Sequence, residues 1–368
     1  MPSTLPLELQ HEIIRLIYRI SQAHDIAYAT LAACALVCKS WTQVAQSLIF
    51  RRAPALTTRG ERLNPRSLSL FVRALRDDSR LGVYVRALTI DVNANFHALL
   101  EGPLSSAEHL PYEDGKAWAA VLNLCPRVEK LKFVGRRSGW DSREVRDRLG
   151  TVAVRPRALE FVTGISTAGV RTLLEMWSDV RWVTIHGLDI LKIVPQPHWA
   201  DMQLVGLELR PSDHRTVPNF NALESEDSSL RELVLLTQRW GEISPVLAAR
   251  ITSLTTIVPP PAHILERFTG LEELIILAAE EGFSPPNTVH HLGYHPLSGM
   301  HAARSNAHAT NVAAAMSALP DLQLVTATRT SSEAVLDVLQ GACRMRDVDF
   351  VVYPDGYSLP REKNLDWI

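Results

Sequence analysis

Residues 128–133 read Val-Glu-Lys-Leu-Lys-Phe, with apolar side chains at the first, fourth and sixth positions. The same hydrophobic-x-x-hydrophobic-x-hydrophobic pattern returns along most of the 368-residue chain. Clear copies occur at Val85/Leu88/Ile90, Val128/Leu131/Phe133, Val180/Val183/Ile185, Leu204/Leu207/Leu209, Leu230/Leu233/Leu235, Leu271/Leu274/Ile276, Val289/Leu292/Tyr294, Leu322/Val325/Ala327 and Met345/Val348/Phe350. Weaker copies lie around Leu159/Phe161 and Leu254/Ile257. Because side chains alternate between the two faces of a strand, each copy predicts a short strand with one apolar face.

The copies are regularly spaced over the middle of the chain. Their central positions at 131, 159, 183, 207, 233 and 257 are separated by 28, 24, 24, 26 and 24 residues, and the spacing is irregular beyond them. Helix-like stretches lie between the strands, at 116–124, 168–177, 245–250, 262–268, 311–319 and 332–342. A repeated strand-then-helix unit predicts an α/β fold with a parallel sheet on one side and helices on the other. Such units cannot bury their apolar faces alone, so we expect them to stack into a curved solenoid.

This period lies inside the window of about 20 to 29 residues that is typical of leucine-rich repeats. Residues 67–353 therefore resemble an irregular leucine-rich-repeat domain, with parallel strands on the concave face and helices outside. Residues between the core positions of each strand are expected to line the concave face: Lys130, Lys132, Glu160, Trp182, Thr184, His186, Glu208, Arg210, Glu232, Glu273, His291, His295, Asp347 and Asp349.

The concave face is the expected surface for binding a protein substrate. The side chains predicted to make this contact are Lys130, Lys132, Trp182, His186, Glu208, Arg210, Glu232 and Glu273. A large aromatic residue with polar neighbours is typical of interface hot spots, and Trp182 has this setting. The alternative is ordinary solvated strand polarity, with Trp182 covered by a loop.

The N-terminal helix carries more apolar surface than one core needs. On a helical wheel the apolar arc from Leu5 to Ile20 spans roughly 200°, whereas a stripe of about 100° suffices for a helix lying on one core. One apolar cluster contains Leu9, Ile13, Leu16, Ile17 and Ile20, and a second contains Leu7, Ile14 and Tyr18. Two further helices are predicted, one from Ile26 to Val37 with Asp25 as its N-cap, and one that includes Trp41 and Leu48.

The motifs of these helices resemble the F-box. They are Leu5-Pro6-Leu7-Glu8-Leu9, then Ile13-Ile14, then Leu36-Val37-Cys38-Lys39-Ser40-Trp41, and the resemblance covers about 45 of the 368 residues. The linker from Gln22 to Tyr28 is more polar and longer than in many F-boxes. The resemblance implies that residues 1–52 dock on a Skp-type adaptor, and that the repeat domain presents a protein substrate to a cullin-RING ubiquitin ligase.

The two apolar clusters are expected to have different partners. We expect Leu9, Ile13, Leu16 and Ile17 to hold the small domain together. The residues expected to contact the adaptor are Leu5, Pro6, Leu7, Ile14, Leu36, Val37 and Trp41. For some of them, Trp41 above all, the alternative is a role in the core of the small domain. The alternative is a repeat scaffold without a ligase role, whose N-terminal helices only cap the solenoid. A cap would hide Leu5, Leu7 and Ile14 under the first repeat, whereas a docking surface would leave them exposed.

The composition of the chain argues against nucleic-acid binding, membrane binding and secretion. With 38 basic and 40 acidic residues the net charge is −2, so no global field favours nucleic acid or anionic membranes. No stretch has the pattern of a secretion signal or of a membrane span, which predicts an intracellular, cytoplasmic or nuclear protein. The expected organisation is an F-box at 1–52, a linker at 53–66, the repeat domain at 67–353 and a C-terminal tail at 354–368.

Sharper chemical hypotheses are not favoured. The four cysteines are too few for a disulfide framework, and Cys34 and Cys38 lack further zinc ligands nearby. The histidines at 290, 291, 295, 301 and 308 have no acidic residue among them, and 293–307 is expected to be a loop. Residues 136–157 hold seven arginines around Trp140, a pattern more typical of a solvated surface than of a nucleic-acid site. Because common catalytic motifs are also absent, we expect no metal, cofactor or enzymatic activity.

Overall fold

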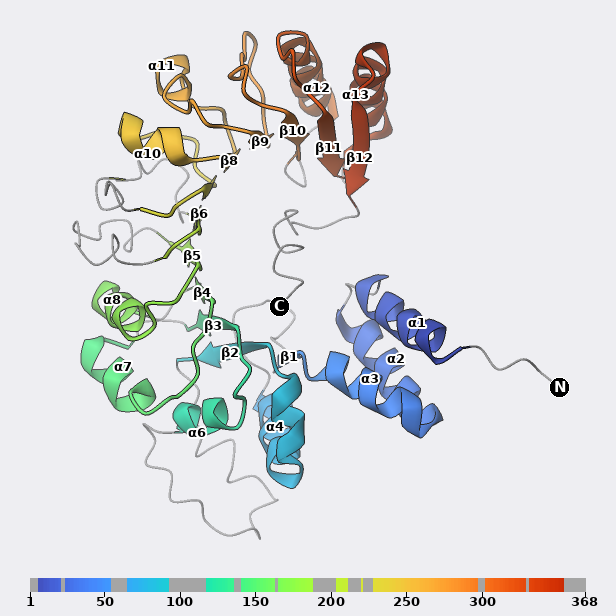
Figure 1. The fold of residues 1–368 in the computed structure, drawn as a ribbon, viewed down its shortest axis with the longest axis vertical. Helices are drawn as coiled ribbons and strands as arrows, with labels where there is room; N and C mark the ends of the chain where they lie inside the picture. Colours follow the sequence, from blue (N-terminus) through green and yellow to red (C-terminus); the bar gives the residue numbers. More distant parts are fainter. Residues whose placement is uncertain are drawn as a thin grey trace, which may run out of the picture. The chain divides into compact units, whose positions relative to one another are not determined.

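The structure is a computed structural model, which describes residues 6–20, 24–53, 65–92, 117–135, 140–162, 165–187, 203–210, 220, 228–296, 302–328 and 331–353 (Figure 1). The chain forms two compact units, Met1–Trp177 and Ser178–Ile368. Both units contain parallel strands with helices on one side of them. The face of the strands that points away from the helices is called the strand face below.

Unit 1 begins with three helices, α1 (Leu7–Ile20), α2 (His24–Val37) and α3 (Lys39–Ile49). They share a small core that contains Ile14, Leu31, Cys34, Ala45 and Leu48. Each helix contacts the other two, and the Trp41 indole N–H donates to Gln10 Oε1 at 2.6 Å, joining α3 to α1. Because α2 begins at His24, Asp25 lies in its first turn, and the prediction of Asp25 as its N-cap is wrong.

The described residues in the rest of unit 1 form four strands and five helical segments. The strands are β1 (Arg52–Ala53), β2 (Ala87–Asp91), β3 (Lys130–Val134) and β4 (Ala158–Phe161). They pair in sequence order, and all the pairs are parallel. The helical segments are α4 (Pro65–Asp77), the 3-10 helix η1 (Ser79–Tyr84), α6 (Ala117–Asn123), α7 (Ser142–Leu149) and α8 (Thr167–Met176). The register aligns Leu88, Leu131 and Leu159, which are all buried. The Phe133 and Phe161 rings stack at 5.5 Å between centroids in the same core.

Unit 2 continues the strand-helix alternation. Its strands also pair parallel in sequence order. They are β5 (Trp182–His186), β6 (Gly206–Arg210), β7 (Glu232–Leu235), β8 (Ser253–Thr256), β9 (Glu273–Ile276), β10 (His291–Tyr294), β11 (Leu324–Thr328) and β12 (Asp349–Tyr353). Its described helices are α10 (Pro245–Arg250), α11 (Ala262–Leu265), α12 (Ala302–Met316) and α13 (Glu333–Arg346). None of the described helices of either unit has the length and hydropathy needed to cross a membrane.

The spacing pattern located the strands correctly. Each of the eleven predicted copies overlaps one of the strands β2 to β12, and the pairings within each unit are parallel. The α/β prediction is therefore confirmed. The register is wrong in two copies, because Leu254 and not Ile257 pairs with Leu233, and Phe350 and not Val348 pairs with Val325. The six helix-like stretches coincide with α6, α8, α10, α11, α12 and α13.

Four local predictions are wrong or incomplete. The residues 53–66 do not form only a linker, since β1 includes Ala53 and α4 starts at Pro65. Helix α12 begins at Ala302, so the expected loop at 293–307 is shorter. Asp347 is not a strand residue: it caps α13 in the left-handed conformation with φ of 56°. The sequence pattern also missed α7, which begins with a capping box between Asp141 and Glu144. The expected tail at 354–368 lies outside the described residues.

Candidate interaction surfaces

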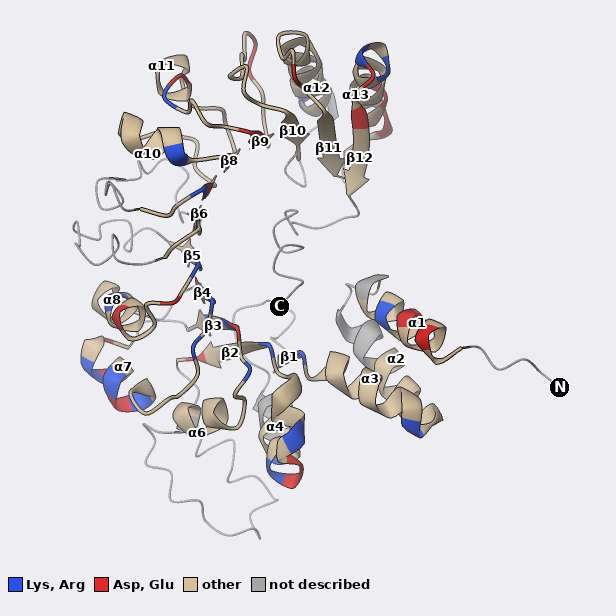
Figure 2. Ribbon diagram, viewed as in Figure 1, with Lys and Arg blue, Asp and Glu red and all other residues tan. Residues whose placement is uncertain are grey.

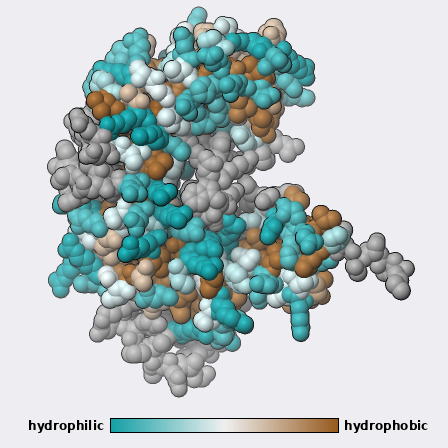
Figure 3. Space-filling view, in the orientation of Figure 1, coloured by the Kyte–Doolittle hydropathy of each residue, from teal (hydrophilic) through white to brown (hydrophobic). Residues whose placement is uncertain are grey.

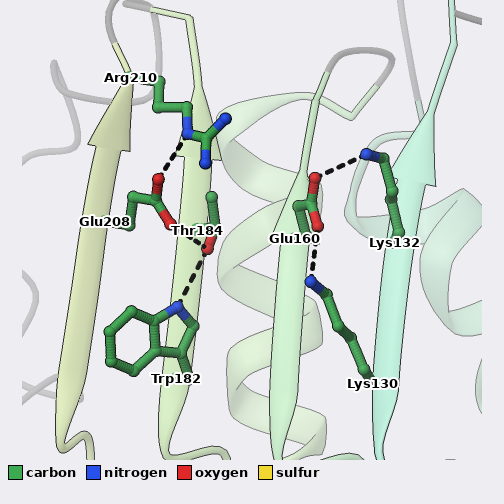
Figure 4. Close-up of polar contacts among 7 residues, drawn as sticks. All are labelled: Lys130, Lys132, Glu160, Trp182, Thr184, Glu208 and Arg210. Carbon is green, nitrogen blue, oxygen red and sulfur yellow. Dashed lines mark hydrogen bonds and ion pairs between the residues drawn. The ribbon is translucent and has the colours of Figure 1, made fainter. Parts of the chain in front are cut away.

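In unit 1, the two predicted lysines occupy the strand face together with one glutamate. Lys132 lies beside Glu160 in the β3–β4 register. Lys130 Nζ and Lys132 Nζ lie 2.9 and 2.7 Å from the two oxygens of Glu160 (Figure 4). The three side chains are partly buried, so the two ion pairs are stronger than solvent-exposed ones. Two positive charges share one negative charge, which leaves this cluster able to attract an acidic group.

In unit 2, Trp182 lies flat against the backbone of the neighbouring strand. It faces Gly206 in the β5–β6 register, and a methyl group placed on Gly206 would overlap the indole ring. The indole N–H donates to Thr184 Oγ1 at 3.1 Å on the same strand (Figure 4). Trp182 is partly buried against Val234 and Ile275, which form a small apolar cluster on the strand face. The ring is therefore held in one orientation with part of it still accessible.

A buried carboxylate continues this network. The Thr184 hydroxyl donates to Glu208 Oε2 at 3.2 Å, and Arg210 Nε donates to Glu208 Oε1 at 2.5 Å (Figure 4). Glu208 is buried, whereas Arg210 is about one-third exposed. Trp182, Glu208 and Arg210 thus lie together as predicted. The buried Glu208 carboxylate holds the Arg210 side chain in place through their hydrogen bond. His186 faces Arg210 in the register, and Glu232 faces Gly206 from β7.

A third polar network extends across β8 to β11 on the strand face of unit 2. Ser253 Oγ donates to Glu273 Oε2, and His291 Nδ1 lies 2.7 Å from Glu273 Oε1. His291 Nε2 and His295 Nε2 lie 3.0 and 3.2 Å from the same hydroxyl, Thr326 Oγ1. The sequence offered no acidic partner near these histidines, because Glu273 comes from a neighbouring strand.

The remaining histidines of that cluster are not brought to one site. His308 Nδ1 bonds the carbonyl of Ala279 at 2.5 Å from helix α12, and His301 lies outside the described residues. Among the described residues there is no group of three or more His, Cys, Asp or Glu side chains placed to hold a metal ion.

Burial changes the acid-base behaviour of His295. Desolvation, together with the nearby His291, lowers the pKa of His295 from the ordinary 6.5 to about 4, and Glu273 opposes this shift only in part. Between these two values the unfolded chain binds a proton that the folded chain does not bind. Stability is therefore fully present above about pH 6.5 and decreases as the pH falls towards 4.

We expect the free energy of unfolding to decrease by about 2 kcal/mol between pH 7 and pH 5 because of His295 alone. Urea unfolding at the two pH values measures this difference. In His295→Asn, whose amide keeps a donor for Thr326 and does not titrate, the loss should shrink by the same amount. An equal pH dependence in both proteins would contradict the assignment.

The three-helix segment exposes a row of apolar side chains. Leu9, Ile13 and Leu16 follow one another on the outer side of α1, and all three are exposed. At the C-terminal end of α2, Leu36 and Val37 are 88% and 62% exposed. Figure 3 shows hydrophobic residues on the visible surface of this segment, and Figure 2 shows that α2 is uncharged over its described side chains. These five residues are called the outer apolar row below.

The prediction of two apolar faces on α1 is correct, but four of its residues were assigned to the wrong face. Ile14 was expected on the adaptor surface, yet it is fully buried between α2 and α3. Leu9, Ile13 and Leu16 were expected in the core, yet they are exposed, whereas Ile17 does pack against the core. The reason is that α1 turns Gln10, Ile14 and Ile17 towards its neighbours, and Gln10 is bonded to Trp41.

The other expected adaptor residues differ in their burial. Pro6 and Leu7 are exposed at the start of α1, and Leu5 lies outside the described residues. Trp41 packs against the helix core and so has a structural role in this segment.

Trp140, the aromatic residue of the arginine-rich stretch, is not exposed. Trp140 is buried, its indole N–H donates to the carbonyl of Val92 at 3.1 Å, and Arg148 lies over its ring at 5.2 Å from the centroid. The tryptophan therefore belongs to the core of unit 1.

Comparison of the chain with protein-family models and with curated proteins finds no match. The surfaces described above therefore carry the functional assignment.

Proposed function

We propose that the chain is a substrate-recognition subunit of a Skp-cullin-F-box ubiquitin ligase. In this proposal α1 to α3 form an F-box that docks on a Skp-type adaptor, and the strand face of the leucine-rich-repeat-like region binds a protein substrate. The chain itself is then a non-catalytic receptor that needs neither a metal nor a cofactor.

The outer apolar row is the observation that carries the proposal. A three-helix segment of this size has a core of its own, yet it leaves Leu9, Ile13, Leu16, Leu36 and Val37 exposed. Large apolar side chains exposed on so small a segment are a candidate surface for another protein. Leu36 and Val37 also belong to the motif on which the F-box resemblance rests, so motif and exposure point to the same residues.

The exposure of Leu7 and of the outer apolar row favours docking over the capping alternative. A cap would place these side chains under the first repeat, and they are exposed instead. Ile14 is hidden, but its partners are α2 and α3 and not a repeat strand. The cap function is in this respect the weaker of the two hypotheses.

The strand-face clusters support a protein as the substrate. Trp182 offers a pre-oriented ring next to an Arg210–Glu208 pair in unit 2, and the lysine pair of unit 1 offers positive charge. Fixed aromatic and arginine side chains are the residue types that most often dominate protein interfaces. We therefore propose that Trp182 and Arg210 contribute more to substrate capture than the buried Glu208, which positions Arg210.

The docking surface is tested by Leu36→Asp/Val37→Asp. Because both side chains are exposed, this double variant should fold normally, whereas two charges in an apolar interface should weaken adaptor binding at least about 100-fold. Co-purification with a Skp-type adaptor measures the effect. Leu70→Asp/Val246→Asp, which charges exposed apolar residues outside the helix segment, should bind as the wild type does. Full adaptor recovery with the first variant would contradict the proposal.

A further inference from the structure

Strand β12 is the last described strand of unit 2, and within the described part of the chain it pairs on one side only. It runs from Asp349 to Tyr353, and its five residues pair with β11 in a parallel register. Within the described residues no strand pairs with its other edge. The N–H and C=O groups on that edge are arranged as a template for another strand.

The end of the sheet also exposes apolar side chains. Val352 continues the row of Ile276, Tyr294 and Ala327, which are buried, yet Val352 is 38% exposed. Val351 on the strand face is 40% exposed, and Met345 at the end of α13 is 83% exposed. As far as the chain is described, the apolar rows of unit 2 therefore end at β12 without the polar outer face that terminal repeats normally carry.

The sequence of β12 lacks the usual protection of an edge. Proteins protect such edges with lysine, proline, bulges or inward charges. Residues 349–353 read Asp-Phe-Val-Val-Tyr, with no lysine and no proline, and the only charge stands at the first position. Residues of this type have high strand propensity and form stable cross-strand pairs.

We propose that this edge binds a second copy of the chain by antiparallel pairing of β12 with β12, with the two-fold axis at Val351. In that register Phe350 faces Val352 of the second copy, and both lie on the helix side of the sheet. The exposed ends of two apolar cores are then joined into one. The proposal does not depend on the ligase role, since it uses only unit 2.

The charge pattern of the strand fits this pairing. Asp349 faces Tyr353 of the second copy, so the two carboxylates stand apart at the ends of the paired strands. Like charges directly opposite one another would oppose the pairing, and this register avoids them. When the five-residue strand pairs about its central residue, every residue of one copy has a partner in the other.

A symmetric disulfide tests the register. The Asp349 N–H donates to Gln323 on the β11 side, and the backbone groups of Val351 point the same way, so the two copies of Val351 would form a non-hydrogen-bonded antiparallel pair. The Cα atoms of such a pair lie about 4.5 Å apart, inside the range of about 4.4 to 6.8 Å that a disulfide spans. We expect Val351→Cys to give a covalent dimer under mild oxidation. Asp349→Cys should not, because its copies would be separated by about 13 Å along the strands. Both variants are made with Cys38→Ser, since Cys38 is an exposed free thiol whereas Cys34, Cys125 and Cys343 are buried.

Sedimentation of the reduced full-length chain completes the test. From about 1 to 100 µM, the range expected for a small interface, the wild type should shift towards a dimer. Val351→Lys should stay monomeric, while Val246→Lys, an exposed valine on α10, should behave as the wild type does. A wild type that is monomeric at every concentration, or equal cross-linking of the 349 and 351 cysteines, would overturn the proposal.

Discussion

Replacing Ile14 by alanine is expected to open the three-helix segment, whereas the same change at Ile13 is expected to leave it folded. Ile14 is 0% exposed and lies in the core with Leu31, Ala45 and Leu48, whereas Ile13 is 44% exposed. Truncating a buried isoleucine costs about 2 to 5 kcal/mol, and an exposed one costs less than about 0.5 kcal/mol. Two adjacent residues of identical chemistry therefore have opposite roles.

Hydrogen exchange read by mass spectrometry distinguishes the two variants. In Ile14→Ala the amides of α1 to α3 should exchange more than about tenfold faster, while those of unit 2 should not change. In Ile13→Ala exchange should match the wild type, and only adaptor binding should decrease. Equal protection of the three helices in both variants would contradict the burial assignment of α1.

A methyl group at Gly206 is expected to destabilise unit 2 through Trp182. Because the added Cβ would overlap the indole ring, Gly206→Ala should displace the ring from its cluster with Val234 and Ile275. Overpacking of this kind costs about 1 to 3 kcal/mol, which urea unfolding can measure. The indole would also lose its hydrogen bond to Thr184.

The combined variant Trp182→Ala/Gly206→Ala isolates the clash from other effects of the substitution. Without the ring, alanine at position 206 should cost less than about 0.5 kcal/mol, because alanine is no worse than glycine in a strand. The two changes should therefore be strongly non-additive. A cost of Gly206→Ala that is the same in both backgrounds would show that Trp182 does not lie over Gly206.

The strand positions could be predicted because one apolar pattern fixes both the strand and its register. In parallel strands the middle leucines face each other, so Leu131, Leu159 and Leu207 mark the core wherever they occur. The irregular repeats after Pro261 were also found, because β9 to β11 keep the pattern although their spacing varies. In β12 the predicted pattern is displaced by two residues, since Phe350 occupies the central position predicted for Val348. Helix α7 was missed because its eight residues are mostly charged and only Val145 and Leu149 are buried.

The inward face of α1 could not be predicted from its own sequence. A helical wheel shows that two apolar arcs exist, but the choice between them depends on the neighbours. The Gln10–Trp41 hydrogen bond joins residues 31 positions apart, and it fixes the rotation of α1 that buries Ile14. Likewise, Glu273, His291 and Thr326 meet only because three strands are in register, and the Thr326–His291 bond spans 35 positions.

We propose that the three-helix segment binds a ligase adaptor while the strand face captures a substrate. Affinity purification with mass spectrometry, with cullin activation inhibited so that substrates accumulate, tests it most directly. Wild type should recover a Skp-type adaptor, a cullin and a substrate; Leu36→Asp/Val37→Asp should recover only the substrate, and Trp182→Ala only the adaptor and the cullin. A wild-type sample that contains no adaptor and no cullin, from a chain shown to be folded, would contradict the claim.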